Sequence, residues 1–199
     1  MFEQTVFIVD DDEAVRDSIK ELVESVGLRA ETFANAQSFL KSCTTDQAGC
    51  LVLDVRMARM SGLALQVKLN EMDVKLPIVF ITGHGDVRMA VEGLKAGAVD
   101  FIQKPYHEQN LLDSINNALE VNAQNRTKSE KKSTLQEHVA RLTARQRDVM
   151  ELLVEGHGNR AIAERLGISR RTVEVHRHRV LQKCAVESVP QLIRLFNQR

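Results

Sequence analysis

Apolar and polar positions in the first half of the chain fall into short blocks whose period changes from one block to the next. Five blocks have the length and the apolar content of strands: Val6–Val9, Leu28–Phe33, Cys50–Asp54, Pro77–Thr82 and Val99–Ile102. Short apolar runs of this kind are typical of strands buried in a parallel sheet. We therefore expect five strands in this half.

Helical patterns fill the intervals between these blocks. A helix is expected over Glu13–Val26, with one apolar side made of Val15, Ile19, Leu22, Val23 and Val26. Asn35 and Ser61 are expected to cap two further helices, and the last two begin near Asp86 and Glu108. Because strand and helix alternate throughout, we expect an α/β domain: a doubly wound, five-stranded parallel sheet with helices on both faces.

The composition changes after position 121. Residues 122–134 are polar and contain neither Gly nor Pro, whereas a flexible linker would be richer in Gly or Ser. This favours a helix that continues from the preceding one, and a disordered tether is the alternative. We divide the chain into a first domain over residues 1–121, a linker over 122–140 and a second domain over 141–199.

The second domain reads as four short helices. Thr143 and Gln146 have the form of a capping box before the first of them. Asn159 and Ser169 are expected to cap the next two, and the third helix should run to about Cys184. Two helices joined through Leu-Gly-Ile-Ser form a helix-turn-helix pattern, so we expect an all-α helix-turn-helix domain.

Charge divides the two halves. Residues 1–124 hold 11 Lys and Arg against 19 Asp and Glu, whereas residues 125–199 hold 16 against 8, so the halves carry −8 and +8. Such asymmetry indicates an acidic regulatory part and a basic part that meets nucleic acid. No apolar run is long enough to span a bilayer and no signal peptide is seen, so we expect a cytoplasmic protein without a membrane partner.

Cys43, Cys50 and Cys184 lack metal-ligand spacing, and we expect neither a disulfide nor a zinc site. The chemistry instead gathers where strands end. Asp54 closes one apolar run, and the ends of the other runs supply Asp10, Asp11, Thr82 and Lys104. Carboxyl ends of parallel strands meet at one edge of a sheet.

An Asp after a strand is often only a turn former. A functional role for Asp54 is favoured by the other residues at the strand ends, because together with Asp54 they supply the groups that a phosphoryl acceptor needs. It offers a carboxylate nucleophile, further carboxylates for Mg²⁺, a hydroxyl and a lysine.

These residues resemble the receiver domain of two-component response regulators. The resemblance covers Thr5 to about Leu119 and is carried by Val-Asp-Asp-Asp at 9–12, Leu-Asp-Val-Arg-Met at 53–57, Met-Ser-Gly at 60–62 and Lys-Ala-Gly-Ala-Val-Asp-Phe-Ile-Gln-Lys-Pro at 95–105. It is nearest to the FixJ branch, with a flavodoxin-like fold. One departure is Ala58, where the family usually has Pro.

The resemblance implies that a sensor histidine kinase phosphorylates Asp54. It implies that Mg²⁺ is held by Asp11, Asp54 and the backbone carbonyl of Arg56, with Asp10 acting through water. Oxygen ligands of this kind suit Mg²⁺, which also keeps water and phosphate as ligands.

The resemblance further implies a switch. Thr82 and Lys104 contact the phosphoryl group, and the Lys104–Pro105 bond is cis. Phe101 is the aromatic that moves with Thr82, although a fixed core Phe is the alternative. His84 is placed where a side chain can tune water attack. Phosphorylation then shifts the population toward a form that homodimerises.

The second domain resembles the LuxR/FixJ-type DNA-binding domain. The matching segments are Leu142-Thr-x-Arg-Gln, Asn159-Arg-x-Ile-Ala, Leu166-Gly-Ile-Ser and Thr172-Val-Glu-Val-His. One departure is Gln146, where Glu is usual.

Helical geometry alone sorts the third helix of this domain. Val173, Val180 and Cys184 should face the core, and the opposite face should enter the major groove of double-stranded DNA. The resemblance implies base contacts from Glu174, Val175 and His178. Phosphate contacts are expected from Arg170, Arg171, Thr172, Arg177 and Arg179.

The sequence thus predicts a transcription regulator switched by aspartyl phosphorylation. It is not expected to be an enzyme beyond catalysing its own phosphorylation and dephosphorylation. An Mg²⁺-dependent phosphohydrolase is the alternative, but such enzymes commonly carry a second Asp where this chain has Arg56. A phosphorelay intermediate is a third possibility, which the positively charged second half argues against.

Overall fold

The computed structural model describes residues 4–83 and 87–197, with the side chains at 87, 131–136 and 197 left aside. The chain divides into two compact units, of which the first ends at Arg126 and the second begins at Thr127. We refer to them as the first unit and the second unit and describe each by itself. Within the described residues, no helix has both the length and the apolar content to cross a membrane.

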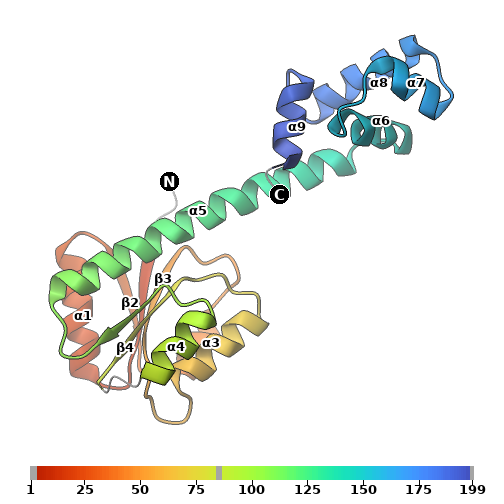
Figure 1. Ribbon diagram of the computed structural model, residues 1–199. Helices are drawn as coiled ribbons and strands as arrows, with labels where there is room; N and C mark the ends of the chain where they lie inside the picture. Colours follow the sequence, from red (N-terminus) through yellow and green to blue (C-terminus); the bar gives the residue numbers. More distant parts are fainter. Residues whose placement is uncertain (1–3, 84–86, 198–199) are drawn as a thin grey trace. The chain divides into compact units, whose positions relative to one another are not determined.

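The first unit is built on a parallel sheet (Figure 1). Its strands are β1 (Thr5–Val9), β2 (Arg29–Phe33), β3 (Gly49–Asp54), β4 (Ile78–Thr82) and β5 (Asp100–Gln103), in the order β2-β1-β3-β4-β5. Every residue of β1, β3 and β4 is buried, as expected for central strands covered on both faces. The predicted α/β fold is confirmed.

Helices cover both faces of this sheet (Figure 1). They are α1 (Glu13–Ser25), α2 (Ala36–Ser42), α3 (Gly62–Glu71), α4 (Val87–Lys95) and α5 (Glu108–Ala140). On one face Ile19 of α1 and Ile115 of α5 pack against the sheet. On the other face Phe39 of α2 and Leu65 of α3 join the second apolar cluster.

Helix starts follow the predicted caps, but one helix end does not follow the predicted pattern. Asn35 and Ser61 accept the backbone N–H groups of Ser38 and Ala64, respectively. Val26 was expected on the buried side of its helix and is instead 50% exposed. The reason is that α1 ends at Ser25 and the chain turns through Gly27 at φ 78°, so Val26 no longer follows the helical period.

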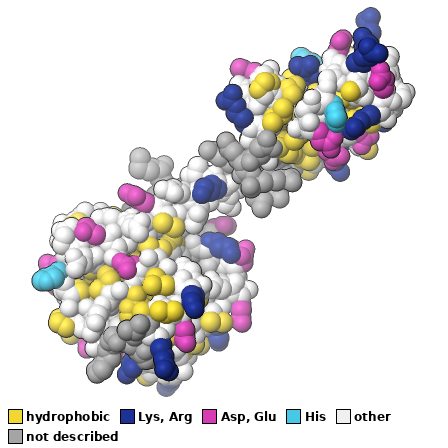
Figure 2. Space-filling view, viewed as in Figure 1, with side chains coloured by type: hydrophobic (Ala, Val, Ile, Leu, Met, Phe, Trp, Pro, Cys, Tyr) yellow, Lys and Arg dark blue, Asp and Glu magenta, His cyan; other side chains and the backbone are white. Residues whose placement is uncertain are grey.

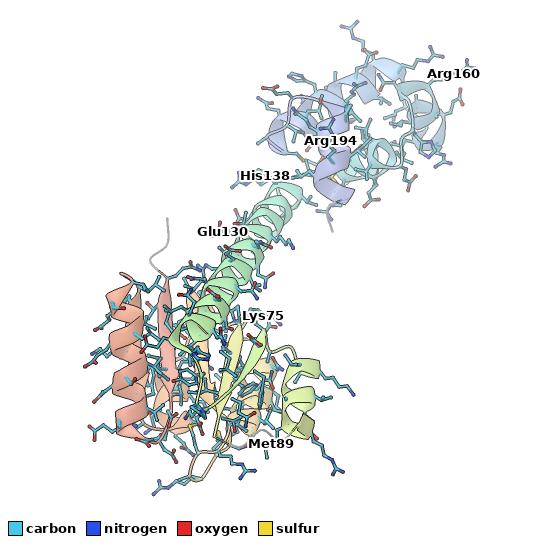
Figure 3. All side chains as sticks on the ribbon, turned by 60° about the vertical axis from the view of Figure 1, so that its left-hand side comes forward. Lys75, Met89, Glu130, His138, Arg160 and Arg194 are labelled. Carbon is cyan, nitrogen blue, oxygen red and sulfur yellow. The ribbon has the colours of Figure 1, made fainter. Side chains whose placement is uncertain are left out.

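The second unit consists of α6 (Ala144–Val154), α7 (Asn159–Leu166), α8 (Arg170–Lys183) and α9 (Val189–Asn197), together with the end of α5. Its core includes Leu142, Val149, Ile162, Val180 and Leu192. Arg160 of α7 and Arg194 of α9, labelled in Figure 3, belong to this unit. The predicted helical domain is confirmed.

The predicted cap at Asn159 is wrong. Gly158 occupies the N-cap position of α7 in extended conformation and has no side chain to offer, while Asn159 is the first helical residue. The capping box at Thr143 and Gln146 is present, and Ser169 caps α8 by accepting from the N–H of Thr172.

Candidate functional site

Three carboxylates meet at the carboxyl edge of the sheet. Asp10 and Asp11 follow β1, and Asp54 is the last residue of β3, which pairs with β1 in parallel register. One carboxylate oxygen from each lies within 4.8 Å of those from the other two. Asp10 and Asp54 are buried, whereas Asp11 is exposed. This acidic cluster is compatible with Mg²⁺, a hard cation that prefers carboxylate oxygens.

Backbone N–H groups orient all three carboxylates. Asp10 Oδ1 accepts from the N–H of Asp12 at 2.9 Å, and Asp54 Oδ2 accepts from the N–H of Arg56 at 2.8 Å. Asp11 Oδ2 accepts from the N–H of Ala58 at 2.8 Å. The receiver family that this domain resembles usually has Pro at position 58, and Pro has no backbone N–H to donate. The Ala58 departure therefore adds a hydrogen bond that fixes Asp11.

Lys104 links two of these carboxylates. Its Nζ lies 2.7 Å from Asp10 Oδ2 and 2.9 Å from Asp54 Oδ1, while its backbone N–H donates to the carbonyl of Thr82 at 2.7 Å. The Lys104–Pro105 peptide bond is cis. The structure thus brings together four of the residues that the sequence placed at strand ends.

The electrostatics of the cluster follow from its burial. Burial raises the pKa of Asp54, and the charge of Asp10 acts in the same direction, while the hydrogen bond from Lys104 opposes the shift. Burial alone would lower the pKa of Lys104, but its hydrogen bonds to Asp10 and Asp54 outweigh burial, so its pKa is raised. Among the described residues, the ammonium of Lys104 is thus the cation that contacts the two buried carboxylates, Asp10 and Asp54.

Thr82 lies beside this cluster at the end of β4, and Phe101 lies on the neighbouring strand β5, where it pairs with Phe80. Thr82 ends β4 and is fully buried, next to the Ile81 position that pairs with Asp54. Phe101 is half-buried, and its ring centroid lies 6.1 Å from that of Phe80. His84 lies outside the described residues.

The Met-Ser-Gly motif has a steric reason. A Cβ on Gly62 would lie 2.3 Å from the backbone oxygen of Asp54, which is too close for any side chain. The N–H of Gly62 donates to the carbonyl of Val55 at 2.9 Å. Gly62 therefore lets α3 begin directly against the residue that ends β3.

One residue of this site was missed by the sequence analysis. Arg16 Nη1 donates to the backbone carbonyl of Asp10 at 2.8 Å, which holds the loop after β1 from the first turns of α1. The side chain of Asp12 caps α1 by accepting from the N–H of Ala14, and the available signal was a basic side chain one turn beyond that cap. The pattern alone did not distinguish it from a solvated helix residue.

In the second unit, α8 has the two faces that its periodicity predicted. Val173, Val180 and Cys184 are buried, which confirms the predicted core face. Of the residues expected to contact DNA, six are exposed, namely Arg170, Arg171, Glu174, Val175, His178 and Arg179. Thr172 and Arg177 are half-buried.

Those two half-buried side chains already have partners. The hydroxyl of Thr172 lies 2.8 Å from that of Ser169, and Arg177 Nη1 donates to Asn159 Oδ1 at 3.4 Å. An open pocket of about 340 Å³ is lined by Asn159, Glu174, Arg177, His178 and Leu181. The amide of Asn159 is thus turned toward α8 and does not cap its own helix.

Lys183 of α8 has neutral partners. Its Nζ donates to Gln146 Oε1 at 2.9 Å and to the carbonyl of Arg141 at 2.8 Å. Gln146 is 4% exposed and also completes the capping box of α6. The family that this domain resembles usually has Glu at position 146, and a Glu there would pair the ammonium of Lys183 with a carboxylate.

Two family descriptions match this chain. Residues 6–116 match the response regulator receiver domain, and residues 140–196 match the luxR family of bacterial regulatory proteins. These two segments contain the carboxylate cluster and α8, respectively.

Known proteins match over nearly the whole chain. The response regulator protein TodT of Pseudomonas putida is 43% identical over 190 residues, which cover 96% of this chain and 84% of TodT. The transcriptional regulatory protein FixJ of Azorhizobium caulinodans is 40% identical over 190 residues, or 96% and 90% of the two chains. Among solved structures, the response regulator StyR is 44% identical, covers both chains fully and has a TM-score of 0.89.

Proposed function

This chain belongs to the response regulators that join a receiver domain to a LuxR-type DNA-binding domain, and on that basis we propose that Asp54 is its phosphoacceptor. Membership of this family of transcriptional regulators implies a kinase and DNA as partners. We assign the receiver domain to residues 1–121, a linker to 122–140 and the DNA-binding domain to 141–199.

The observation that carries this proposal is the position of Asp54 beside Lys104 and two further carboxylates. A carboxylate oxygen of Asp54 attacks the phosphorus of a phosphohistidine, the P–N bond breaks, and an acyl phosphate forms. The N–H of Arg56 holds the other oxygen, so that the reacting carboxylate has a fixed orientation. Lys104 then transfers one of its contacts from the carboxylate to a phosphoryl oxygen.

We propose that Asp11, Asp54 and the backbone carbonyl of Arg56 hold Mg²⁺, with Asp10 acting through water. The ion would supply positive charge to the transferring phosphoryl oxygens. The exposure of Asp11 beside buried Asp54 supports this, because the cluster keeps one side open to solvent. The receiver domain would use this site only for its own phosphorylation and dephosphorylation.

Phosphorylation would act on the rest of the chain through Thr82 and Phe101. Thr82 moves toward the phosphoryl group, Phe101 follows, and the altered surface pairs with a second copy of the chain. Hydrophobic side chains reach the surface of the first unit (Figure 2), and α4 contributes Val91 and Leu94, which are 43% and 46% exposed. Exposed apolar side chains on α4 support a face that a partner covers.

In the second unit, α8 would enter the major groove. Glu174, Val175 and His178 are exposed on one face and would contact bases. The phosphate contacts would come from Arg170, Arg171, Thr172, Arg177 and Arg179. A homodimer would place two such helices on half-sites about one helical turn apart.

The first test concerns the acceptor. The full-length chain is incubated with acetyl phosphate and Mg²⁺, and the phosphoryl groups are counted by mass spectrometry. Wild-type protein should gain one group and Asp54→Asn none, because an amide is not a nucleophile. Asp73→Asn is the control, since that carboxylate is exposed and pairs only with Lys75 among its described contacts. A stable phosphoryl group on Asp54→Asn would remove the proposal.

The second test concerns the output. Genomic fragments are selected with phosphorylated and unphosphorylated chain, and the bound sequences are compared. The phosphorylated protein should recover sites made of two half-sites. Equal recovery by both forms would contradict a phosphorylation switch while leaving DNA binding intact.

A further inference from the structure

The ring of Phe80 lies between two glycines in the first unit. Phe80 is fully buried on β4. A Cβ on Gly62 would lie 3.1 Å from its Cε1 atom, and a Cβ on Gly93 would lie 2.9 Å from its Cε2 atom. Since Gly62 begins α3 and Gly93 lies in α4, the ring fills the space between both helices and the sheet without slack.

The same ring connects the acceptor with the proposed switch. Gly62 is in contact with the backbone of Asp54, where a Cβ would come within 2.3 Å of the carbonyl oxygen. Phe80 and Phe101 are also paired on the neighbouring strands β4 and β5, with their rings tilted by 48° and the ring centroids 6.1 Å apart. A continuous series of packed groups therefore runs from Asp54 through Phe80 to Phe101.

A buried amide holds α4 against this ring. Gln66 of α3 is 1% exposed, and its Nε2 donates to the backbone carbonyl of Gly93 at 3.0 Å. One turn later, Asn70 donates from Nδ2 to the carbonyl of Ala96 at 3.2 Å, in a solvent-exposed position. Because an amide that loses its partner in the core is costly, Gln66 favours the arrangement of α4 seen here.

We propose that Gln66 is a positioning residue that, through Gly93 and Phe80, holds α4 in the unphosphorylated arrangement. This rests on the proposed function. When Phe101 moves inward, Phe80 has no free space to take up, so α4 has to move away from α3 at Gly93. The hydrogen bond from Gln66 is then lost, and its strength sets how much the unphosphorylated chain resists switching.

The test is the self-association of the full-length chain, measured by sedimentation with and without beryllofluoride as a phosphoryl mimic. Gln66→Met keeps a similar shape and removes the donor. It should raise the association constant of the unmodified chain by about 5- to 150-fold, because each of the two copies in a dimer gives up one hydrogen bond, and it should leave the beryllofluoride-bound constant unchanged. Asn70→Ala, at an exposed bond, should move the same constant in the same direction by less.

The matched control is Gln47→Met, because the Gln47 amide oxygen accepts only a local N–H, that of Thr44, among its described contacts. It should change neither constant. The proposal fails if Gln66→Met leaves both constants unchanged, or if it changes both by the same factor, which would indicate a role in folding or in the interface alone. Should Gln66→Met not fold, an unchanged constant for Asn70→Ala would overturn the proposal. If beryllofluoride leaves the association constant of the wild-type chain unchanged, the proposed function itself is refuted.

Discussion

The ammonium of Lys104 lies 2.9 Å from a carboxylate oxygen of Asp54. Lys104 follows β5 and Asp54 ends β3, and β4 lies between these two strands in the sheet. The same ammonium contacts Asp10 at 2.7 Å, so one cation serves two buried carboxylates. Such a cation stabilises the metal-free cluster and competes with a metal for the same oxygens. Both effects can be measured.

Lys104→Met should make stability depend on Mg²⁺. In the presence of a chelator the variant should lose about 1–3 kcal/mol of unfolding free energy, because Asp10 and Asp54 remain buried without their cation. Added Mg²⁺ should restore most of this loss. Urea unfolding with and without Mg²⁺ measures the difference.

Lys75→Met is the control for that experiment. Lys75 forms an exposed ion pair with Asp73, and such pairs contribute little to stability. A Lys104→Met chain as stable as wild type in chelator would show that the ammonium contacts contribute nothing.

Asp54→Asn should stabilise the metal-free chain at neutral pH. The pKa of Asp54 is raised in the folded state by burial, so its contribution to stability is present below its ordinary pKa of 3.8 and is lost as pH rises through the folded value. At pH 7 the ionised group therefore opposes folding, and an amide removes that effect, by about 1 kcal/mol. The advantage of the variant should shrink as the pH falls toward the ordinary value, as followed by urea unfolding at several pH values. A variant less stable than wild type at pH 7 would contradict it.

Arg177→Ala and Glu174→Ala should affect DNA binding differently. Arg177→Ala, which removes a proposed phosphate contact, should weaken binding to specific and random DNA alike and lower the salt dependence by about one charge. Glu174→Ala, which removes a proposed base contact, should change the preferred base at one position, by roughly 1–3 kcal/mol. Binding titrations over a salt series, with a randomised operator, separate the two effects. An unchanged selected motif for Glu174→Ala would mean that α8 docks in another orientation.

Residues 127–199 alone should bind DNA weakly and without any need for phosphate. This segment has its own apolar core, which includes Val149, Ile162 and Val180, so it should fold by itself. A gel-shift titration compares it with the phosphorylated full-length chain, which should bind more tightly because a dimer engages two half-sites. If the fragment is inactive while the phosphorylated chain binds as a monomer, release of one domain by the other would replace dimerisation as the switch.

Much of the cluster at the sheet edge could be predicted because a parallel sheet places the carboxyl ends of all its strands at the same edge. Asp10, Asp54 and Lys104 are far apart in the sequence, yet each follows an apolar run, and the fold brings them together. The contacts of the Lys104 ammonium with Asp10 and Asp54 did not follow from the sequence, because the same pattern also fits a lysine whose side chain is solvated.

Other features depend on backbone geometry that residue types do not specify. Asn159 is a good cap by type, but Gly158 adopts the extended cap conformation and leaves the amide free to reach Arg177. Gln66 fits the helical pattern of α3 as an ordinary polar residue, and its partner is a backbone carbonyl on another helix. Val26 lost its predicted burial because the helix ended one residue earlier than its apolar spacing suggested.

The neutral partner of Lys183 also bears on how quickly the protein finds DNA. With Gln146 in place of an acidic residue, the ammonium of Lys183 is not cancelled, and residues 125–199 keep their full formal charge of +8. Long-range attraction to a polyanion grows with that charge and speeds diffusional encounter at low ionic strength. A single uncharged side chain, buried in the first turn of α6 and in contact with Lys183 of α8, thereby favours faster capture of the double helix and a longer stay on non-target sequence before an operator is reached.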